Sequence, residues 1–143
     1  MTDIQQTVYV VEDDEAVRDS LELLLKSDGK LVKTYENAAV FLKDYSETMA
    51  GCIVLDIRMP GMDGMELQKK LNDKHSILPI IFVTGHGDVP MAVDAMKEGA
   101  VDFIQKPIGK RRYLRKSRLH WNRIWNSVKP LMKNKRLFVG SRA

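Results

Sequence analysis

The stretch "IVLDIRMPGMDG", residues Ile53 to Gly64, decides the fold because it joins two contrasting patterns. An apolar run of the kind that forms buried strands ends on one carboxylate, Asp56. Residues rich in Pro and Gly follow at once, and they predict a loop. The sequence therefore places a single acid where a buried strand opens into a turn.

The same alternation of strand, loop and helix recurs along the first 108 residues. Apolar residues at helical spacing predict helices at residues 14–28 and 63–75 and after Asn37 and Asp88, and these last two residues are expected to cap their helices. The alternation predicts βαβ units and a parallel sheet with right-handed crossovers. All the expected strands except the second are nearly all apolar, as strands covered on both faces should be. The five strands are expected at residues 7–12, 30–35, 52–56, 78–84 and 101–105.

The composition suits one globular domain. The chain has 143 residues, of which 44% are hydrophobic, and this is enough for a substantial core. No apolar run approaches the roughly 18 residues of a membrane span, and the N-terminus lacks the pattern of a signal peptide. Cys52 is the single cysteine, so an internal disulfide is excluded. These features lead us to expect a cytoplasmic protein.

Polar side chains follow four of the five expected strands. In an open parallel sheet, ligands bind beyond the carboxyl ends of the strands, so we expect these side chains to meet. Clustered carboxylates repel one another, and a hard cation such as Mg²⁺ relieves the repulsion. A metal beside a carboxylate, a hydroxyl and an ammonium group suits a phosphoryl group that the carboxylate attacks. The side chains are Glu12, Asp13, Asp14, Asp56, Thr84 and Lys106.

Three stretches carry a resemblance to a known family. They are "VVEDDEAVRDSL", "IVLDIRMPGMDG" and "IIFVTGHGDVPMAVDAMKEGAVDFIQKPI", and they resemble the receiver domain of two-component response regulators. The third is most similar to the FixJ-like branch, whose members usually add a C-terminal helix-turn-helix. The resemblance covers about residues 7–108. It implies an α/β, flavodoxin-like, doubly wound (βα)5 fold whose five-stranded parallel sheet has the order 2-1-3-4-5.

The resemblance also implies a phosphoacceptor and a metal site. Asp56 would accept the phosphoryl group. Mg²⁺, or Mn²⁺ as a substitute, would be held by Asp13, by Asp56 and by the backbone carbonyl of Arg58. Glu12 would act on the metal through water. Many family members have Asp where this chain has Glu12, so whether that residue contacts the metal directly is left open.

The resemblance also implies three residues that bind the phosphoryl group or form the switch, and one cis peptide bond. Thr84 would bind the phosphoryl group and shift inward, and Lys106 would form an ion pair with it. Phe103 would change its side-chain conformation when Thr84 moves. The peptide bond before Pro107 would be cis.

The function implied by the resemblance is signalling. A sensor histidine kinase would donate the phosphoryl group, and the domain would catalyse only its own phosphotransfer and slow dephosphorylation. The helix after Asp88, the strand at residues 101–105 and the last helix would form the face that changes, and a homodimer through that face is expected. A pseudo-receiver that only binds partners is disfavoured by the complete set of polar residues. A metal-dependent phosphatase is disfavoured because Arg58 stands where many such enzymes have an acid or base.

The last 35 residues differ in charge from the rest. Residues 1–108 carry 11 Lys and Arg against 19 Asp and Glu, whereas residues 109–143 carry 12 Lys and Arg and no acid. We expect a receiver domain at residues 1–126 and a basic tail at residues 127–143, with no output domain recognisable. The apolar residues of the last helix, which Pro130 should break, would share one face. They are Leu114, Trp121, Trp125, Val128 and Met132.

Three hypotheses account for this basic segment. It is a nucleic-acid arm, an ordinary fifth helix with a solvated basic face, or the product of a reading-frame shift near Gly109. The frame-shift hypothesis has some support, because codons compatible with Gly109–Lys116 permit an acidic, amphipathic segment when they are read from the second base. The receiver resemblance does not favour DNA binding by this chain, although the basic tail leaves it open. The chain would be a stand-alone receiver or a truncated regulator.

Overall fold

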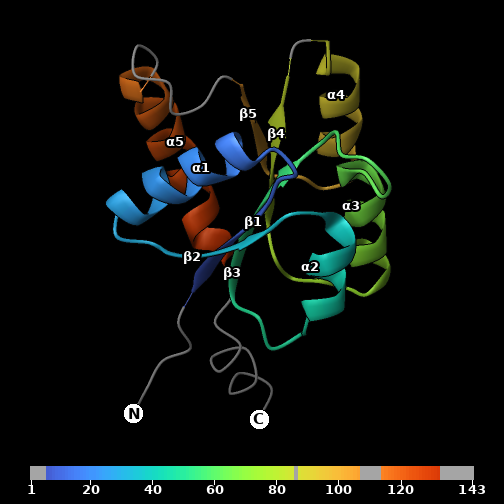
Figure 1. Ribbon diagram of the computed structural model, residues 1–143. Helices are drawn as coiled ribbons and strands as arrows, with labels where there is room; N and C mark the ends of the chain where they lie inside the picture. Colours follow the sequence, from blue (N-terminus) through green and yellow to red (C-terminus); the bar gives the residue numbers. More distant parts are fainter. Residues whose placement is uncertain (1–5, 86, 107–113, 133–143) are drawn as a thin grey trace, which may run out of the picture.

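The structure is a computed structural model that describes residues 6–85, 87–106 and 114–132, with the backbone alone described between 114 and 120. Five parallel strands form one sheet in the order β2-β1-β3-β4-β5, as the sequence predicts (Figure 1). Each pair of neighbouring strands keeps one register throughout; for example, Asp56 lies beside Val83. The strands are β1 (Thr7–Val11), β2 (Leu31–Tyr35), β3 (Gly51–Asp56), β4 (Ile80–Thr84) and β5 (Asp102–Gln105).

Helices follow the strands and cover both faces of the sheet (Figure 1). The cap predicted at Asn37 forms, and Asp14 and Asp63 cap two further helices: each of the three side chains accepts a backbone N–H of the first turn. No helix in the described part of the chain is long and apolar enough to cross a membrane. The helices are α1 (Glu15–Ser27), α2 (Ala38–Asp44), α3 (Gly64–Asp73), α4 (Val89–Lys97) and α5 (Leu114–Val128).

The sheet has a separate hydrophobic core on each face. One core packs against α2, α3 and α4, and the other packs against α1 and α5. Side chains of a strand point alternately to the two faces, so Ile53 and Leu55 of β3 join the first core, and Cys52 and Val54 join the second. All six residues of β3 are buried, which explains its nearly continuous apolar sequence.

The C-terminal helix α5 completes the second core. Trp121, Ile124 and Val128 are fully buried against the sheet, and Met132 lies beyond them in the same core. Trp125 is only partly buried and stacks on Trp121. The sequence predicts all of these residues on one helix face except Ile124. It also predicts Leu114 there, but the side chain of Leu114 lies outside the described residues.

Pro130 ends the helix in the way the sequence predicts. Helix α5 stops at Val128, and a single 3-10 turn, η2 (Lys129–Leu131), follows with Pro130 in its first turn. An N–H is not needed there, so proline is tolerated. The proposed division after residue 126 stays a prediction, although the buried side chain of Val128 continues the core beyond that point.

Burial of Cys52 in β3 leads to a prediction about its reactivity. The thiol is fully buried, and this burial raises its pKa to about 12. Because the reactive species is the thiolate, the native protein should not react with a thiol-specific reagent at neutral pH, whereas the unfolded chain should react at once. Absorbance of the released chromophore measures both rates. Equal rates with and without denaturant would contradict the burial of this residue.

Candidate functional site

The turn after β3 fixes the position of Asp56. This carboxylate ends a buried strand and is itself only 2% exposed. Helix α3 begins close to the strand end because Gly64 has no side chain: a Cβ there would lie 2.4 Å from the carbonyl oxygen of Asp56. A capping box between Asp63 and Glu66 then starts the helix. The Pro- and Gly-rich turn therefore brings a helix against the strand end and leaves the carboxylate at the rim of the sheet.

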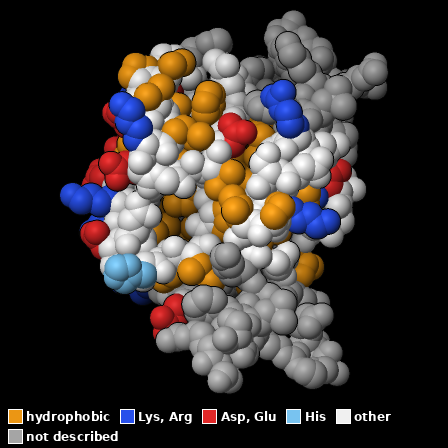
Figure 2. All heavy atoms as spheres, turned by 180° about the vertical axis from the view of Figure 1, so that it is seen from behind, with side chains coloured by type: hydrophobic (Ala, Val, Ile, Leu, Met, Phe, Trp, Pro, Cys, Tyr) orange, Lys and Arg blue, Asp and Glu red, His pale blue; other side chains and the backbone are white. Residues whose placement is uncertain are grey.

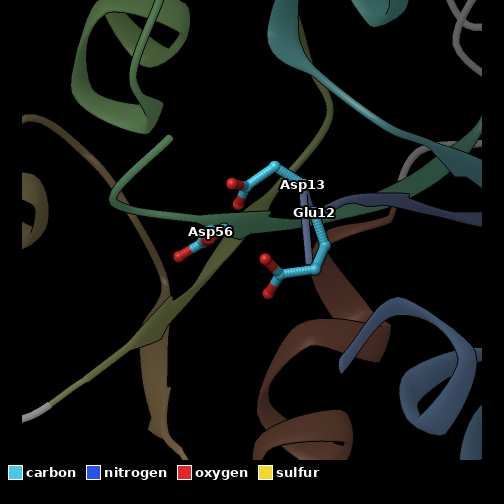
Figure 3. Close-up of side chains that lie close together, drawn as sticks. All are labelled: Glu12, Asp13 and Asp56. Carbon is cyan, nitrogen blue, oxygen red and sulfur yellow. The ribbon is translucent and has the colours of Figure 1, made fainter. Parts of the chain in front are cut away.

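Three carboxylates meet at this rim, as the sequence predicts. One oxygen from each of Glu12, Asp13 and Asp56 lies within 4.8 Å of the other two. Figure 3 shows the three side chains gathered at the ends of β1 and β3, which are neighbours in the sheet. Glu12 and Asp56 are buried, whereas Asp13 is exposed to solvent. Asp14 does not join the cluster, since its side chain caps α1.

Lys106 provides the positive charge of the site. Its Nζ lies 3.5 Å from Glu12 Oε1 and 3.5 Å from Asp56 Oδ2. Burial and the neighbouring Asp56 raise the pKa of Glu12 to about 9, and burial also raises the pKa of Asp56. Burial alone would lower the pKa of Lys106, but Asp56 and Glu12 outweigh it and raise that pKa. Burial therefore outweighs the opposite effect of Lys106 on the pKa of both carboxylates.

Arg18 is a site residue that the sequence analysis missed. Its guanidinium group, on α1, donates to the backbone carbonyl of Glu12 at 2.8 Å and to that of Asp13 at 3.4 Å. The amide of Asp14 donates to Glu12 Oε2 at 3.2 Å. These bonds hold the two acids at the end of β1. No sequence motif marks Arg18, because its role depends on how α1 packs.

The expected switch residues Thr84 and Phe103 lie on β4, which is next to β3, and on β5, the edge strand beyond it. Thr84 is 3% exposed, and its carbonyl oxygen accepts the amide N–H of Lys106 at 2.7 Å. Phe103 is partly buried and packs against the core under α4. The cis peptide bond expected before Pro107 lies outside the described residues.

Asp88 differs from what the sequence predicts. Helix α4 begins directly after Asp88, but the carboxylate makes no side-chain cap hydrogen bond. Instead, its Oδ1 forms an ion pair with the guanidinium group of Arg58, and its Oδ2 accepts the N–H of Gly85 at 2.8 Å. Arg58 in turn donates its backbone N–H to Asp56 Oδ1 at 3.3 Å. The stronger partner has displaced the local cap, since a charged pair outweighs a bond to a backbone amide.

The donor atoms of the cluster fit a magnesium ion. Mg²⁺ prefers a few carboxylate oxygens and keeps several waters, and this site offers three carboxylates of which one faces solvent. Burial is the largest cause of the raised pKa of Glu12, and the neighbouring Asp56 carboxylate adds to it. A divalent cation at this position would stabilise the charged form of both carboxylates. Glu12, Asp13 and Asp56 would hold it together.

We expect the substitution Asp13→Ala to weaken Mg²⁺ binding by at least tenfold, or about 1.4 kcal/mol. The substitution removes one of three ligands and one negative charge, and the exposed side chain is not needed for packing. Titration of the purified protein with Mg²⁺, followed by calorimetry, measures the affinity. Asp19→Ala is the matched control because it removes an exposed acid from α1 outside the cluster. Unchanged affinity in Asp13→Ala would place the metal elsewhere.

Comparison with known proteins identifies the family of this chain. Residues 8–118 match the model of the response regulator receiver domain. The FixJ transcriptional regulatory protein of Bradyrhizobium diazoefficiens is 52% identical over 100 residues, which are 70% of this chain and 49% of that protein. The response regulator TmoT of Ectopseudomonas mendocina is 47% identical over 107 residues, which are 75% of this chain and 49% of that protein. The chain thus spans about half the length of the curated relatives that it matches.

Solved structures show the same similarity. The crystal structure of FixJ-N has a TM-score of 0.65 and 44% identity, and the match covers 80% of this chain and 90% of that one. The response regulator StyR has a TM-score of 0.75 and 39% identity, with 97% of this chain and 65% of that chain covered. The chain belongs to the response-regulator receiver domain family. It is a phosphoacceptor domain of two-component signal transduction, and its relatives lie in the FixJ-like branch.

Proposed function

We propose that Asp56 is the residue that accepts the phosphoryl group. The observation that carries this assignment is the position of its carboxylate, which lies beside Glu12 and Asp13 and 3.5 Å from Lys106. The other two acids are placed to bind a metal, and Asp56 has its second oxygen fixed by the N–H of Arg58. Its other oxygen, Oδ2, lies near the ammonium group of Lys106, which would attract an incoming phosphoryl group.

The donor would be the phosphohistidine of a sensor histidine kinase. An oxygen of Asp56 attacks phosphorus, the P–N bond breaks, and the histidine nitrogen leaves with the bonding electron pair and takes up a proton. Lys106 stabilises the negative charge on the phosphoryl oxygens. Bound Mg²⁺ supplies further positive charge for the same oxygens. The domain is a signalling component in the cytoplasm, and its catalytic part is limited to its own phosphorylation and slow dephosphorylation.

A phosphoryl group on Asp56 would favour a second conformation of the site. Thr84 would turn toward the phosphoryl oxygens and vacate space beside Phe103, which is only partly buried. The phosphoryl group has additional contacts only in that state, so it shifts the population toward it. The surface formed by helix α4, strand β5 and helix α5 would then change.

This surface includes an apolar region suited to a second copy of the chain. Hydrophobic side chains gather at the upper left of Figure 2, where α4 lies. Val89, Val93 and Met96 of this helix are 60%, 47% and 39% exposed. We propose that phosphorylation promotes homodimerisation through α4, β5 and α5. DNA binding is not part of the proposal, because it rests only on the charge of the tail.

Incubation with a small phosphodonor tests the proposed function. The intact mass should increase by one phosphoryl group in the presence of Mg²⁺ and should stay unchanged when a chelator removes the metal. Peptide analysis should locate the modification in the stretch that contains Asp56. Phosphate uptake that is independent of Mg²⁺, or located on another residue, would contradict the proposal.

A further inference from the structure

One carboxylate links the two loops that flank Asp56. Asp88 has a side chain only 4% exposed, and it forms an ion pair with Arg58 from the loop after β3. Its other oxygen accepts the N–H of Gly85, the residue after Thr84. Both partners of Asp88 are therefore close neighbours of proposed site residues, and a change at the site reaches Asp88 directly.

Helix α4 lacks a side-chain N-cap hydrogen bond while Asp88 makes these contacts. Asp14 and Asp63, which cap α1 and α3, have extended backbones with ψ of 115° and 177°. Asp88 has ψ of 7° and makes no cap hydrogen bond from its side chain. An N-cap side chain accepts from the second or third residue of the helix, and Pro90 at the second position has no N–H. The N–H of Met91 is thus the donor that a capping Asp88 would use.

A phosphoryl group on Asp56 would compete with Asp88 for Arg58. The backbone N–H of Arg58 already contacts the Asp56 carboxylate, and its side chain is 66% exposed and free to turn. A guanidinium group binds phosphate oxygens with two parallel hydrogen bonds. A dianionic phosphoryl group is therefore a stronger partner than one carboxylate. Once Arg58 leaves, Asp88 would be a buried charge without its counter-ion, which is strongly unfavourable.

We infer that Asp88 exchanges between two positions: it holds Arg58 and Gly85 in the resting protein, and it caps α4 at Met91 when Arg58 turns to the phosphoryl group. The inference rests on the proposed phosphorylation of Asp56 and gives that site a route to α4. Capping requires ψ of Asp88 to become extended, so the first turn of the helix must move. Val89 lies in this turn and is exposed on the surface proposed for homodimerisation.

Amide signals of Gly85 and Met91 report the two positions of Asp88. We expect phosphorylation of the parent chain to shift both signals. Exchange of the Met91 amide with solvent should slow by about fivefold, which corresponds to the roughly 1 kcal/mol of one N-cap. Exchange of the Gly85 amide should become faster. The mass of the same sample shows whether Asp56 carries the phosphoryl group.

The variant Arg58→Gln separates this inference from the proposed function, because it needs no phosphodonor. The substitution removes the counter-ion and keeps the backbone carbonyl proposed for the metal site. Its Gly85 and Met91 signals should move in the same direction as in the phosphorylated parent chain. Asp88→Asn should behave alike, since an amide can cap a helix but cannot replace the ion pair. Lys33→Gln, which breaks the exposed ion pair with Asp44 on β2 and α2, is the matched control and should leave both signals in place.

Two results would overturn the inference. The first is that Gly85 and Met91 keep their resting signals in Arg58→Gln. The second is that both keep them in a parent chain whose mass proves it phosphorylated. If the parent chain takes up no phosphate, the proposed function fails, and Arg58→Gln still decides whether Asp88 moves.

Discussion

Replacement of Asp56 by Asn should abolish phosphate uptake completely. The amide has nearly the same shape and can still accept the N–H of Arg58, so the loop after β3 should keep its structure. It lacks the anionic oxygen that attacks phosphorus, and it removes one charge from the cluster with Glu12 and Asp13. Intact mass after incubation with a small phosphodonor and Mg²⁺ measures the effect.

Two further variants make this result specific. Asp73→Asn removes an exposed acid at the end of α3 and should take up phosphate like the parent chain. Asp13→Asn should slow the uptake without abolishing it, because the acceptor remains while a metal ligand is lost. Uptake by Asp56→Asn equal to that of the parent chain would show that another residue accepts the phosphoryl group.

Replacement of Trp121 by Ala should be the most destabilising change in α5. The indole is fully buried in the core between α5 and the sheet, and loss of a buried Trp costs about 3–5 kcal/mol. The variant's unfolding midpoint in urea should fall accordingly. The result bears directly on the basic C-terminal segment, because a large loss of stability shows that this segment is part of the folded domain.

The same position offers its own control. Trp121 Nε1 is buried and finds no hydrogen-bond partner among the described residues. Trp121→Phe keeps most of the apolar volume and removes that unpaired N–H, so its cost should be much smaller. Leu131→Ala, at a side chain 45% exposed in the turn after α5, should change stability little. A cost below about 1 kcal/mol for Trp121→Ala would mean that α5 contributes little to the core.

Of the three hypotheses for the basic segment, the structure bears most directly on the ordinary fifth helix. Trp121, Ile124 and Val128 recur at helical spacing and fill the core, as an ordinary fifth helix would. The unpaired indole N–H is a local imperfection in that packing. Hydrophobic residues of about the right size are tolerated in cores, so this packing leaves the frame-shift hypothesis open. The DNA sequence that encodes residues 109–143 distinguishes an ordinary fifth helix from the product of a frame shift.

The sequence by itself determined the order of the elements and the polar residues at the strand ends. Buried parallel strands are recognisable because both of their faces are apolar, and the carboxyl ends of such strands meet at one edge. The cluster of Glu12, Asp13 and Asp56 with Lys106 could therefore be predicted from position alone. The same local rules correctly predicted the cap at Asn37.

Only the tertiary structure decided which partner outside its own helix or strand each polar side chain takes. Asp88 carries a local capping signal, yet its carboxylate binds Arg58, 30 residues earlier in the chain. Arg18 holds the carbonyl groups of Glu12 and Asp13 because α1 packs against the sheet beside them. Sequence spacing describes neighbours within one helix or strand, whereas these contacts join separate elements. Their free energy depends on burial and on the exact distance between charges, and both exist only once the chain has folded.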